Sequence, residues 1–428
     1  MKAKLISCAL CVAMLFAYST TIATPTKKQK KKRTETTASY PYVQPKEKPN
    51  FELSAAMNRV YDNYKAATPQ DNELYTQFKY SKLEGFDYHG HNGTVTRRDP
   101  SRIVKANGKY YMWYTLRNTP TIYMGPDKAT ETIPSVDWDL CDIGYATSED
   151  GFTWTEQGVA VHRPEKPQLG WRSISTPDVL YYEGKYYLYY QAFSAISGQD
   201  GGDNCPVTMS WADSPDGPWT SVNEVVVENG AEGAWDHFSI HDPQPVVFND
   251  KIYLYFKSDY NGYDNIIRST GLAIADSPFG PFEKYEKNPV MSSGHETQMF
   301  RFKEGIASIM SKDGHEANTV QYAPDGKNFQ LASICTMVPV AAGIYDPDAF
   351  TGAKYAKGIS WGVSHVHVWG PSSHSYMIRF DCDLSLDVDD PILKKNIGMY
   401  GTEELLSRSL NEDQRSRIVE AAKEDLKK

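Results

Sequence analysis

The chain has 428 residues, of which 23% are charged, and its formal net charge is −9 at pH 7. This acidic balance argues against nucleic acid as a partner, because phosphates attract basic surfaces. Aromatic residues make up 13% of the chain, which suits both β-sheets and sugar-binding sites, where flat ring faces stack on pyranoses.

The N-terminal residues predict export. Lys2 and Lys4 precede an apolar run over 5–17, and the small residues at 21–23 provide a cleavage site. The run is shorter than the ~20 residues of a membrane-spanning helix, so we assign residues 1–23 to a signal peptide. We expect a soluble protein without a membrane span, exported to the periplasm or the extracellular space.

The segments next to the central region differ from it in composition. Residues 24–50 are rich in Lys and Pro and predict a disordered basic linker. Apolar residues at three- and four-residue spacing predict a helix over 51–67, within an N-terminal segment 51–79. A second amphipathic pattern predicts a C-terminal helix over 401–428.

The cysteines that follow the signal peptide are few and widely spaced. Such a pattern does not form a disulfide framework, even in an exported protein. We expect buried thiols at the positions Cys141, Cys205, Cys335 and Cys382.

The central region, residues 80–400, repeats one pattern. Each copy has an apolar strand, a tight turn, an aromatic strand and then an Asp-Gly or Gly-Pro turn, which is typical of a β-propeller. The aromatic strands lie at 110–114, 186–190, 252–256 and 306–310.

A fifth copy is predicted at 358–369 and 376–380, where the strands alternate correctly but the turn signature is lost. We expect a strand from a distant segment to complete it. The predicted fold class is therefore all-β, a five-bladed β-propeller with an N-terminal helical extension.

An acidic residue precedes the apolar strand of each complete copy: Asp99, Asp178, Asp242 and Glu296. In a propeller these positions converge on one axis, where like charges raise some carboxyl pKa values. Such clusters usually serve chemistry or hold a cation. The alternative at any single position is an Asp that satisfies backbone N–H groups at a strand start.

Histidines occur at two further places. His295 stands directly before Glu296 and provides a proton donor opposite the Asp carboxylates, or else is a packed core histidine. His365 and His367 alternate along one strand and face the same way, as a cation ligand, substrate contacts or packed residues. A base and an acid on different blades suit glycoside hydrolysis with inversion, which requires ~6.5–9.5 Å between them.

These stretches together resemble glycoside hydrolase family 117. The matching phrases are 96–102, 132–141, 241–243 and 293–296, within a similarity that covers about residues 51–385. Members of this family are five-bladed propellers that remove 3,6-anhydro-L-galactose from the non-reducing end of neoagaro-oligosaccharides, which derive from red-algal agar.

The resemblance implies roles for individual residues. Asp99 would be the general base, Asp242 would hold substrate or tune the site, and His295 or Glu296 would be the general acid. His365 would bind a divalent cation near the propeller axis. The further substrate-binding candidates are Arg98, Thr176, Asp178, Gln244 and His367.

The family also forms domain-swapped dimers through an N-terminal helical motif. Ser54, Ala56, Arg59 and Asp62 match its steps, which implies a homodimer formed through residues 51–79. The implied partners are thus an oligosaccharide substrate and a second copy of the chain.

Two other function classes stay open at this point. One is another propeller glycosidase, of the arabinosidase or xylosidase type or acting on another algal galactan. The other is a non-catalytic sugar-binding propeller. A sialidase is disfavoured, because the turn box at 148–154 is a folding device and no arginine triad can be assigned.

Overall fold

The computed structural model describes residues 47–62, 73–199, 204–232, 234–258, 268–314 and 316–387. The predicted signal peptide, most of the linker and the C-terminal helix lie outside these residues. Strands dominate the described part, and the helical elements in it are α1 (Ala55–Tyr61), η1 (His89–His91) and η2 (Pro126–Lys128).

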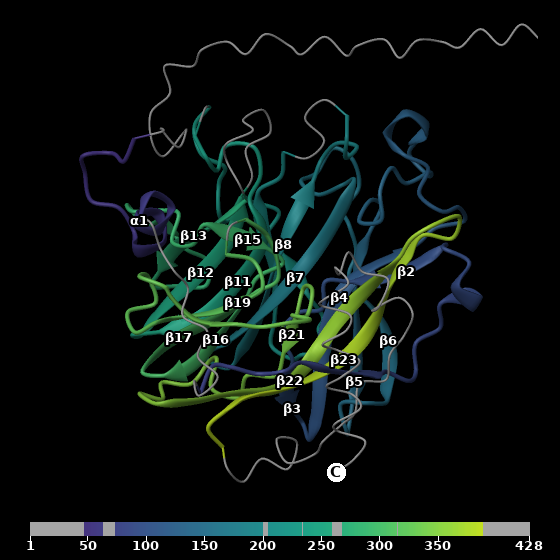
Figure 1. Cartoon of the computed structure of the whole chain (residues 1–428). Coiled ribbons are helices and arrows are strands. Elements are labelled where there is room, and N and C mark those ends of the chain that lie inside the picture. Colours follow the sequence, from purple (N-terminus) through teal and green to yellow (C-terminus); the bar gives the residue numbers. More distant parts are fainter. Residues whose placement is uncertain are drawn as a thin grey trace, which may run out of the picture. The chain divides into compact units, whose positions relative to one another are not determined.

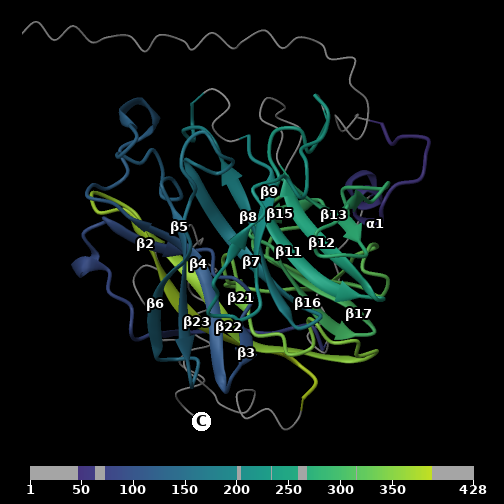
Figure 2. The same ribbon diagram turned by 180° about the vertical axis from the view of Figure 1, so that it is seen from behind.

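Three antiparallel sheets follow one another along the chain (Figures 1 and 2). The first contains β2 (Val95–Arg98), β3 (Val104–Ala106), β4 (Lys109–Asn118), β5 (Asp142–Ser148) and β6 (Trp154–Val161). The second contains β7 (Ser173–Tyr182), β8 (Lys185–Phe193), β9 (Val207–Ala212) and β10 (Thr220–Ser221). The third contains β11 (His241–Phe248), β12 (Lys251–Ser258), β13 (Ser269–Ala275) and β14 (Glu283–Lys284).

A larger sheet has eight strands in two groups. One group is β16 (Gln298–Lys303), β17 (Gly305–Met310), β19 (Thr319–Ala323) and β20 (Gln330–Ile334). The other is β21 (Gly343–Ile344), β22 (Ala356–Val368), β23 (His374–Ser385) and β1 (Lys79–Lys82). A separate ribbon pairs β15 (Ser293–His295) with β18 (Lys312–Gly314).

Two-residue turns connect the first strands of the first three sheets. Both turn residues have positive φ, the combination whose twist matches that of the flanking strands. The turns are Asn107-Gly108, Glu183-Gly184 and Asn249-Asp250. The predicted aromatic strands accordingly lie in β4, β8, β12 and β17, each hydrogen-bonded next to the first strand of its group.

The strand that closes the last group comes from the distant segment before the repeats. β1 pairs with β23, with Lys79 opposite Asp381, as expected for closure by joining distant segments. The two groups of the large sheet share only the pairs Phe302–Lys357 and Lys303–Ala356. The all-β propeller fold is confirmed, whereas the count of five blades depends on treating these groups as separate blades and stays a prediction.

The groups meet around one buried side chain, Arg102, which is 0% exposed. Its guanidinium donates to the carbonyl of Met299 (3.0 Å), to that of Pro245 (3.4 Å) and to Asp346 Oδ2 (3.3 Å). Its backbone N–H donates to Asp178 Oδ1 (2.7 Å). Because these partners lie in or next to the other four strand groups, Arg102 ties the sheets together.

The apolar core lies between neighbouring sheets. One cluster joins Leu180 and Tyr189 of the second sheet to Leu254 and Phe256 of the third. The four predicted thiols are buried, at Cys141, Cys205, Cys335 and Cys382. In the described part of the chain, no helix has the length and hydropathy needed to cross a membrane.

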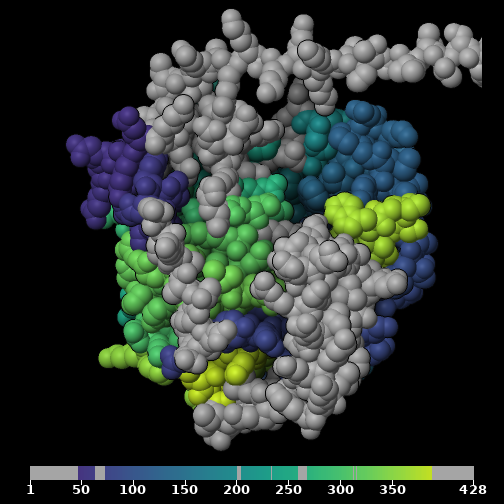
Figure 3. Space-filling view, viewed as in Figure 1, coloured from purple at the N-terminus to yellow at the C-terminus, as the bar shows by residue number. Residues whose placement is uncertain are grey.

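Helix α1 is shorter at its start than predicted. Ser54 is its N-cap, with Oγ accepting from the N–H of Met57 (3.3 Å) and donating to the carbonyl of Pro289 (2.6 Å). The helix therefore begins at Ala55, and the predicted start at residue 51 is wrong. Arg59 pairs with Glu316 (2.7 Å), so α1 contacts later segments, as the purple and green atoms in Figure 3 show.

Candidate active site

Five residues with left-handed backbone torsions mark equivalent positions in the five strand groups. Non-glycine residues adopt positive φ uncommonly, so the repetition is informative. At two of these positions the strand register shifts, between Ser175 and Asp178 and between His241 and Gln244, as in a β-bulge. The five residues are Asp99 (φ 49°), Thr176 (50°), Asp242 (50°), Glu296 (57°) and Ala341 (46°).

These five residues, called the ring below, correct the alignment of the repeats. Thr176, not Asp178, is the equivalent of Asp99 and Asp242, whereas the fourth copy contributes Glu296, the residue predicted there. The sequence signal was the proline that directly follows Asp99, Thr176 and Asp242.

Asp178 and Gln244 lie two residues further along their strands than the ring. Both line a small axial cavity of about 20 Å³, which has room for about one water molecule. Asp178 Oδ1 accepts from the backbone N–H groups of Arg102 and Val179, and burial raises its pKa to about 6 although Arg102 opposes this. Gln244 accepts from the N–H of Met299 (3.0 Å). Both side chains thus bind the inner strands.

A larger cavity of about 830 Å³ adjoins the ring, a volume typical of ligand pockets. The long insertion between β4 and β5 lines part of it, with Tyr123, Val136, Asp137 and Trp138. The other predicted site residues on its wall are Arg98, Asp99, Thr176, Asp242, His295, Glu296, His365 and His367.

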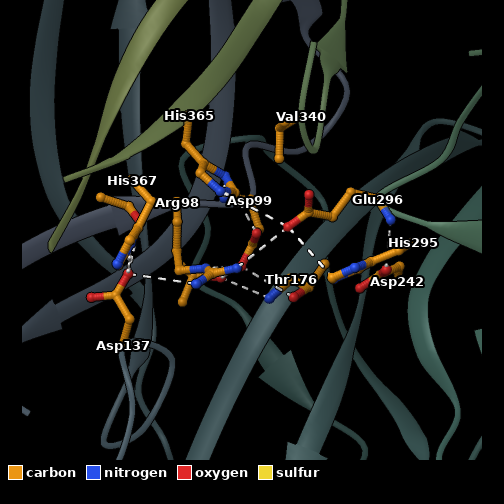
Figure 4. A network of polar contacts seen from close by, with 12 residues as sticks. Arg98, Asp99, Asp137, Thr176, Asp242, His295, Glu296, Val340, His365 and His367 are labelled. Carbon is orange, nitrogen blue, oxygen red and sulfur yellow. Dashed lines mark hydrogen bonds and ion pairs between the residues drawn. The ribbon is translucent and has the colours of Figure 1, made fainter. Parts of the chain in front are cut away.

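Polar contacts fix the carboxylate of Asp99 (Figure 4). Its Oδ2 accepts from Arg98 Nε (2.8 Å), Thr115 Oγ1 (3.3 Å) and Thr176 Oγ1 (3.3 Å). Its Oδ1 lies 3.5 Å from Nδ1 of His365, which accepts the backbone N–H of Asp99 (3.2 Å). Since Oδ2 is bound by three donors, Oδ1 is the oxygen better placed to take a proton.

Arg98 connects three acidic residues. Its guanidinium lies 3.5 Å from Asp137 Oδ2 and 3.6 Å from Glu296 Oε1, besides its bond to Asp99, and it stacks over Trp138 (5.1 Å). Burial opposes its charge, but Asp99 and Asp137 outweigh burial and raise the pKa of Arg98. A permanent cation therefore sits among the carboxylates.

Asp137 is held at the side of the cavity by His367. His367 Nδ1 lies 3.5 Å from Asp137 Oδ2 and 2.9 Å from Ser375 Oγ. Burial would raise the pKa of Asp137, but the contact with His367 and the charge of Arg98 lower it well below its usual range. Asp137 was not predicted as a site residue, although it lies in the quoted stretch 132–141.

Asp242 lies on the third strand group and pairs with a lysine. Lys257 Nζ is 3.4 Å from Asp242 Oδ2, which also accepts the backbone N–H of Glu296 (3.3 Å). The N–H of Asp242 donates to Gln191 Oε1 (2.9 Å). This carboxylate is thus anchored from two sides at the cavity wall.

His295 has an acidic partner that the sequence did not predict. Its Nδ1 lies 2.6 Å from Asp313 Oδ2 and 2.5 Å from Arg268 Nη1, which in turn lies 2.7 Å from the same Asp313 oxygen. The hydrogen bond with His295 lowers the pKa of Asp313 to about 2 against the opposing effect of burial. The β15–β18 ribbon brings Asp313 to His295, and no sequence motif marks that pairing. The other ring nitrogen, Nε2, is 3.7 Å from Glu296 Oε1.

Three donors gather where a cation was predicted. Atoms of Asp99, Glu296 and His365 lie within 4.8 Å of one another, and His365 Nε2 is 3.9 Å from Glu296 Oε1. Imidazole and carboxylate ligands together suit first-row divalent metals. The donor set therefore fits the predicted cation, with two carboxylates beside His365.

Comparisons with known proteins agree with the propeller fold. The model of glycosyl hydrolases family 43 matches residues 132–270. A solved structure with lower sequence identity, a complex described as BT0996 RGII, is 12% identical over 72% of this chain and 92% of its own length, with a TM-score of 0.50, and shows a similar fold. A search of curated proteins gave no match.

A much stronger similarity is to Zg3597, a family 117 glycoside hydrolase produced by the marine bacterium Zobellia galactanivorans. Its sequence is 52% identical to this one, the alignment covers 80% of this chain and 100% of that chain, and the TM-score is 0.73. Identity at this level over a complete chain is decisive for family membership. With its propeller fold and its acidic axial cavity, the chain belongs to glycoside hydrolase family 117.

Proposed function

We propose that this glycoside hydrolase is exo-acting and removes 3,6-anhydro-L-galactose from the non-reducing end of neoagaro-oligosaccharides, with inversion. The observation that supports it best is the placement of Asp99 and the His295–Asp313 pair on different strand groups around one cavity. A sugar ring can lie between a base and an acid arranged in this way.

Asp99 is the general base in this proposal. Arg98, Thr115 and Thr176 hold Oδ2, so Oδ1 takes a proton from the water that attacks the anomeric carbon. A base positioned by donors on its second oxygen is pre-oriented for this transfer, which typically contributes 10²–10⁴-fold in rate.

His295 is the general acid. In this proposal Asp313 accepts from Nδ1 and offsets the positive charge of the protonated ring and of the neighbouring Arg268, so the Nε2 proton is the one given to the glycosidic oxygen. Glu296 is the alternative acid, because its carboxyl group belongs to the ring and lies 3.7 Å from His295 Nε2. Comparison of His295→Ala with Glu296→Gln separates the two.

The remaining polar residues of the cavity bind the sugar. Arg98, Thr176, Asp242 and His367 line the large cavity and present donors and acceptors to hydroxyl groups. Asp178 and Gln244 do not line the large cavity. They line the small cavity and act through the strands that carry the ring. We therefore propose indirect roles for these two, in place of substrate contacts.

A divalent cation held by His365 and Glu296, beside Asp99, is part of the proposal. Such an ion would supply positive charge beside the reacting sugar, and the steps assigned to Asp99 and His295 do not pass through it. Metal analysis of the purified protein tests it, before and after chelation. Loss of a bound metal in His365→Ala supports the assignment, and a metal-free active protein contradicts it.

We also propose a homodimer that forms when residues 51–79 dock on a second copy. The contacts of Ser54 with Pro289 and of Arg59 with Glu316 indicate the surface on which α1 would dock. Light scattering at micromolar concentration tests the dimer, and a monomer for the full mature chain contradicts it. Export through residues 1–23 is proposed as well, and fractionation of expressing cells tests it.

The direct test of the function is incubation with neoagarobiose, with the released sugars separated by chromatography. Aryl arabinosides and xylosides form the second arm of the assay, because the match to glycosyl hydrolases family 43 favours that alternative. Release of sugar from the second arm alone would replace the proposed substrate.

A further inference from the structure

We propose that Trp369 forms a stacking subsite for the leaving-group side of the oligosaccharide. This inference depends on the proposed function, since it assigns a binding surface for the part of the substrate that departs. Trp369 is 77% exposed, the largest exposed fraction given for a large apolar side chain in the described residues. It also lines the large cavity.

The indole continues an aromatic wall that begins deep in the site. His367, which contacts Asp137, lies edge-on to Trp369, with ring centroids 4.3 Å apart. On its other side His367 lies 6.5 Å from the ring of Tyr123, which comes from the insertion between β4 and β5. Trp369 follows the end of β22, in the β22–β23 turn that is yellow-green in Figure 1.

The order of burial along this wall sets the direction of the substrate. His365 is 3% exposed, two residues further along the same strand His367 is partly buried, and Trp369 is mostly exposed. In the proposed exo mode the terminal sugar occupies the inner end of the cavity near Asp99, so the rest of the chain extends outward past Trp369. A ring at the outer end therefore meets the leaving-group sugars.

The chemistry of an exposed indole fits this occupant. Its flat apolar face suits the C–H face of a pyranose, whereas an exposed large apolar surface without a ligand is unfavourable in water. The wall is continuous with the catalytic cavity, so a saccharide already bound at Asp99 is the molecule that reaches it. Trp369 is thus a specificity-determining residue for chain length.

Binding by calorimetry in the Asp99→Asn protein tests the subsite without turnover. Neoagarotetraose is the long probe, and 3,6-anhydro-L-galactose is the short probe that reaches only the inner end. We expect Trp369→Ala to weaken the affinity for the long probe by roughly 3- to 10-fold, since aromatic contacts contribute about that much. The affinity for the short probe should stay unchanged. Trp369→Phe should restore most of the affinity.

Tyr355→Ala is the matched control, because Tyr355 is 57% exposed and lies outside the cavity lining. Unchanged binding of the long probe by Trp369→Ala overturns the subsite. So does an equal loss for both probes, or the same loss in Tyr355→Ala.

The two proposals fail in different ways. If the parent protein does not hydrolyse neoagarotetraose but Asp99→Asn binds it through Trp369, the function is wrong and the subsite stands. If the parent hydrolyses neoagarotetraose but its binding does not depend on Trp369, the function stands and the subsite is wrong. Absence of binding of the long probe by Asp99→Asn contradicts the subsite, and absence of hydrolysis by the parent contradicts the function.

Discussion

The carboxylate of Asp99 depends on small donors as well as on Arg98. Thr176 Oγ1 donates to Asp99 Oδ2 at 3.3 Å, and its backbone N–H donates to Thr115 Oγ1 at 2.7 Å. Thr176 holds the ring position that Asp and Glu hold in other strand groups. One hydroxyl group at this place therefore orients the base instead of adding another charge.

Thr176→Val removes this hydroxyl group with little change of shape. We expect kcat/KM to fall by roughly 3- to 12-fold, because one neutral hydrogen bond contributes about 0.5–1.5 kcal/mol. Thr176→Ser keeps the donor and should retain most of the activity. Equal activity of the Val and Ser variants would show that the bond to Asp99 has no part in catalysis.

Asp313 offers a second test at this scale. In Asp313→Asn the protonated form of His295 loses its partner, so we expect kcat/KM to fall about 10- to 100-fold. Asp276→Asn is the control, since its carboxylate pairs at the surface with Lys251. A fall in Asp313→Asn no larger than that in Asp276→Asn contradicts the role of Asp313.

At the scale of elements, the sequence predicted where strands lie better than it predicted which residues occupy equivalent positions in different strand groups. Hydrophobic alternation and turn residues indicated β4, β8, β12 and β17, because both are local. The ring position was misjudged in the second strand group, where Asp178 follows Thr176 by two residues. A bulge changes which residue faces the axis, and that depends on pairing with the next strand.

In the site, too, residues within a local motif were predicted, and residues brought together by distant strand pairing were not. Asp99, Asp242 and Glu296 were predicted because a short motif surrounds each of them. Asp313 and Trp369 were not predicted, since strand pairing brings the first to His295 and the β22–β23 turn brings the second to the cavity. No sequence spacing predicts that Asp313 contacts His295 or that Trp369 lines the cavity.

Helix α1 provides a prediction at the scale of elements. Ser54→Ala removes the N-cap and the bond to Pro289, which should destabilise the docked helix by about 1–2 kcal/mol. Hydrogen exchange of the amides of 55–61 measures this, with amides of β12 as an internal reference. Faster exchange in α1 alone is expected, and unchanged exchange would contradict the role of the cap.

At the scale of the whole molecule, the buried charges around Arg102 couple folding to pH. Arg102 lies between Asp178 and Asp346, and burial raises the pKa of each carboxyl to about 6 despite the opposing charge of Arg102. A carboxyl whose pKa is higher in the folded state binds more protons when folded. Stability from this source is therefore highest below the unfolded pKa of about 3.9 and falls as pH rises toward about 6.

Asp178→Asn isolates one of these groups, because Oδ1 of the amide can still accept from Arg102 and Val179. The free energy of unfolding of the parent, relative to this variant, should fall by up to about 3 kcal/mol between about pH 4 and about pH 7. Urea denaturation at both pH values measures the difference. A parent that gains stability relative to the variant as pH rises contradicts the raised pKa.

The measurement that tests the central claim most directly is the hydrolysis of neoagarobiose by the parent, Asp99→Asn, His295→Ala and Glu296→Gln, with Asp276→Asn as control. We predict that the parent and the control release both sugars, that Asp99→Asn and His295→Ala lose about 10²-fold or more in kcat, and that Glu296→Gln loses less. The absence of sugar release by the parent, across pH and with added divalent cations, would contradict the proposed function.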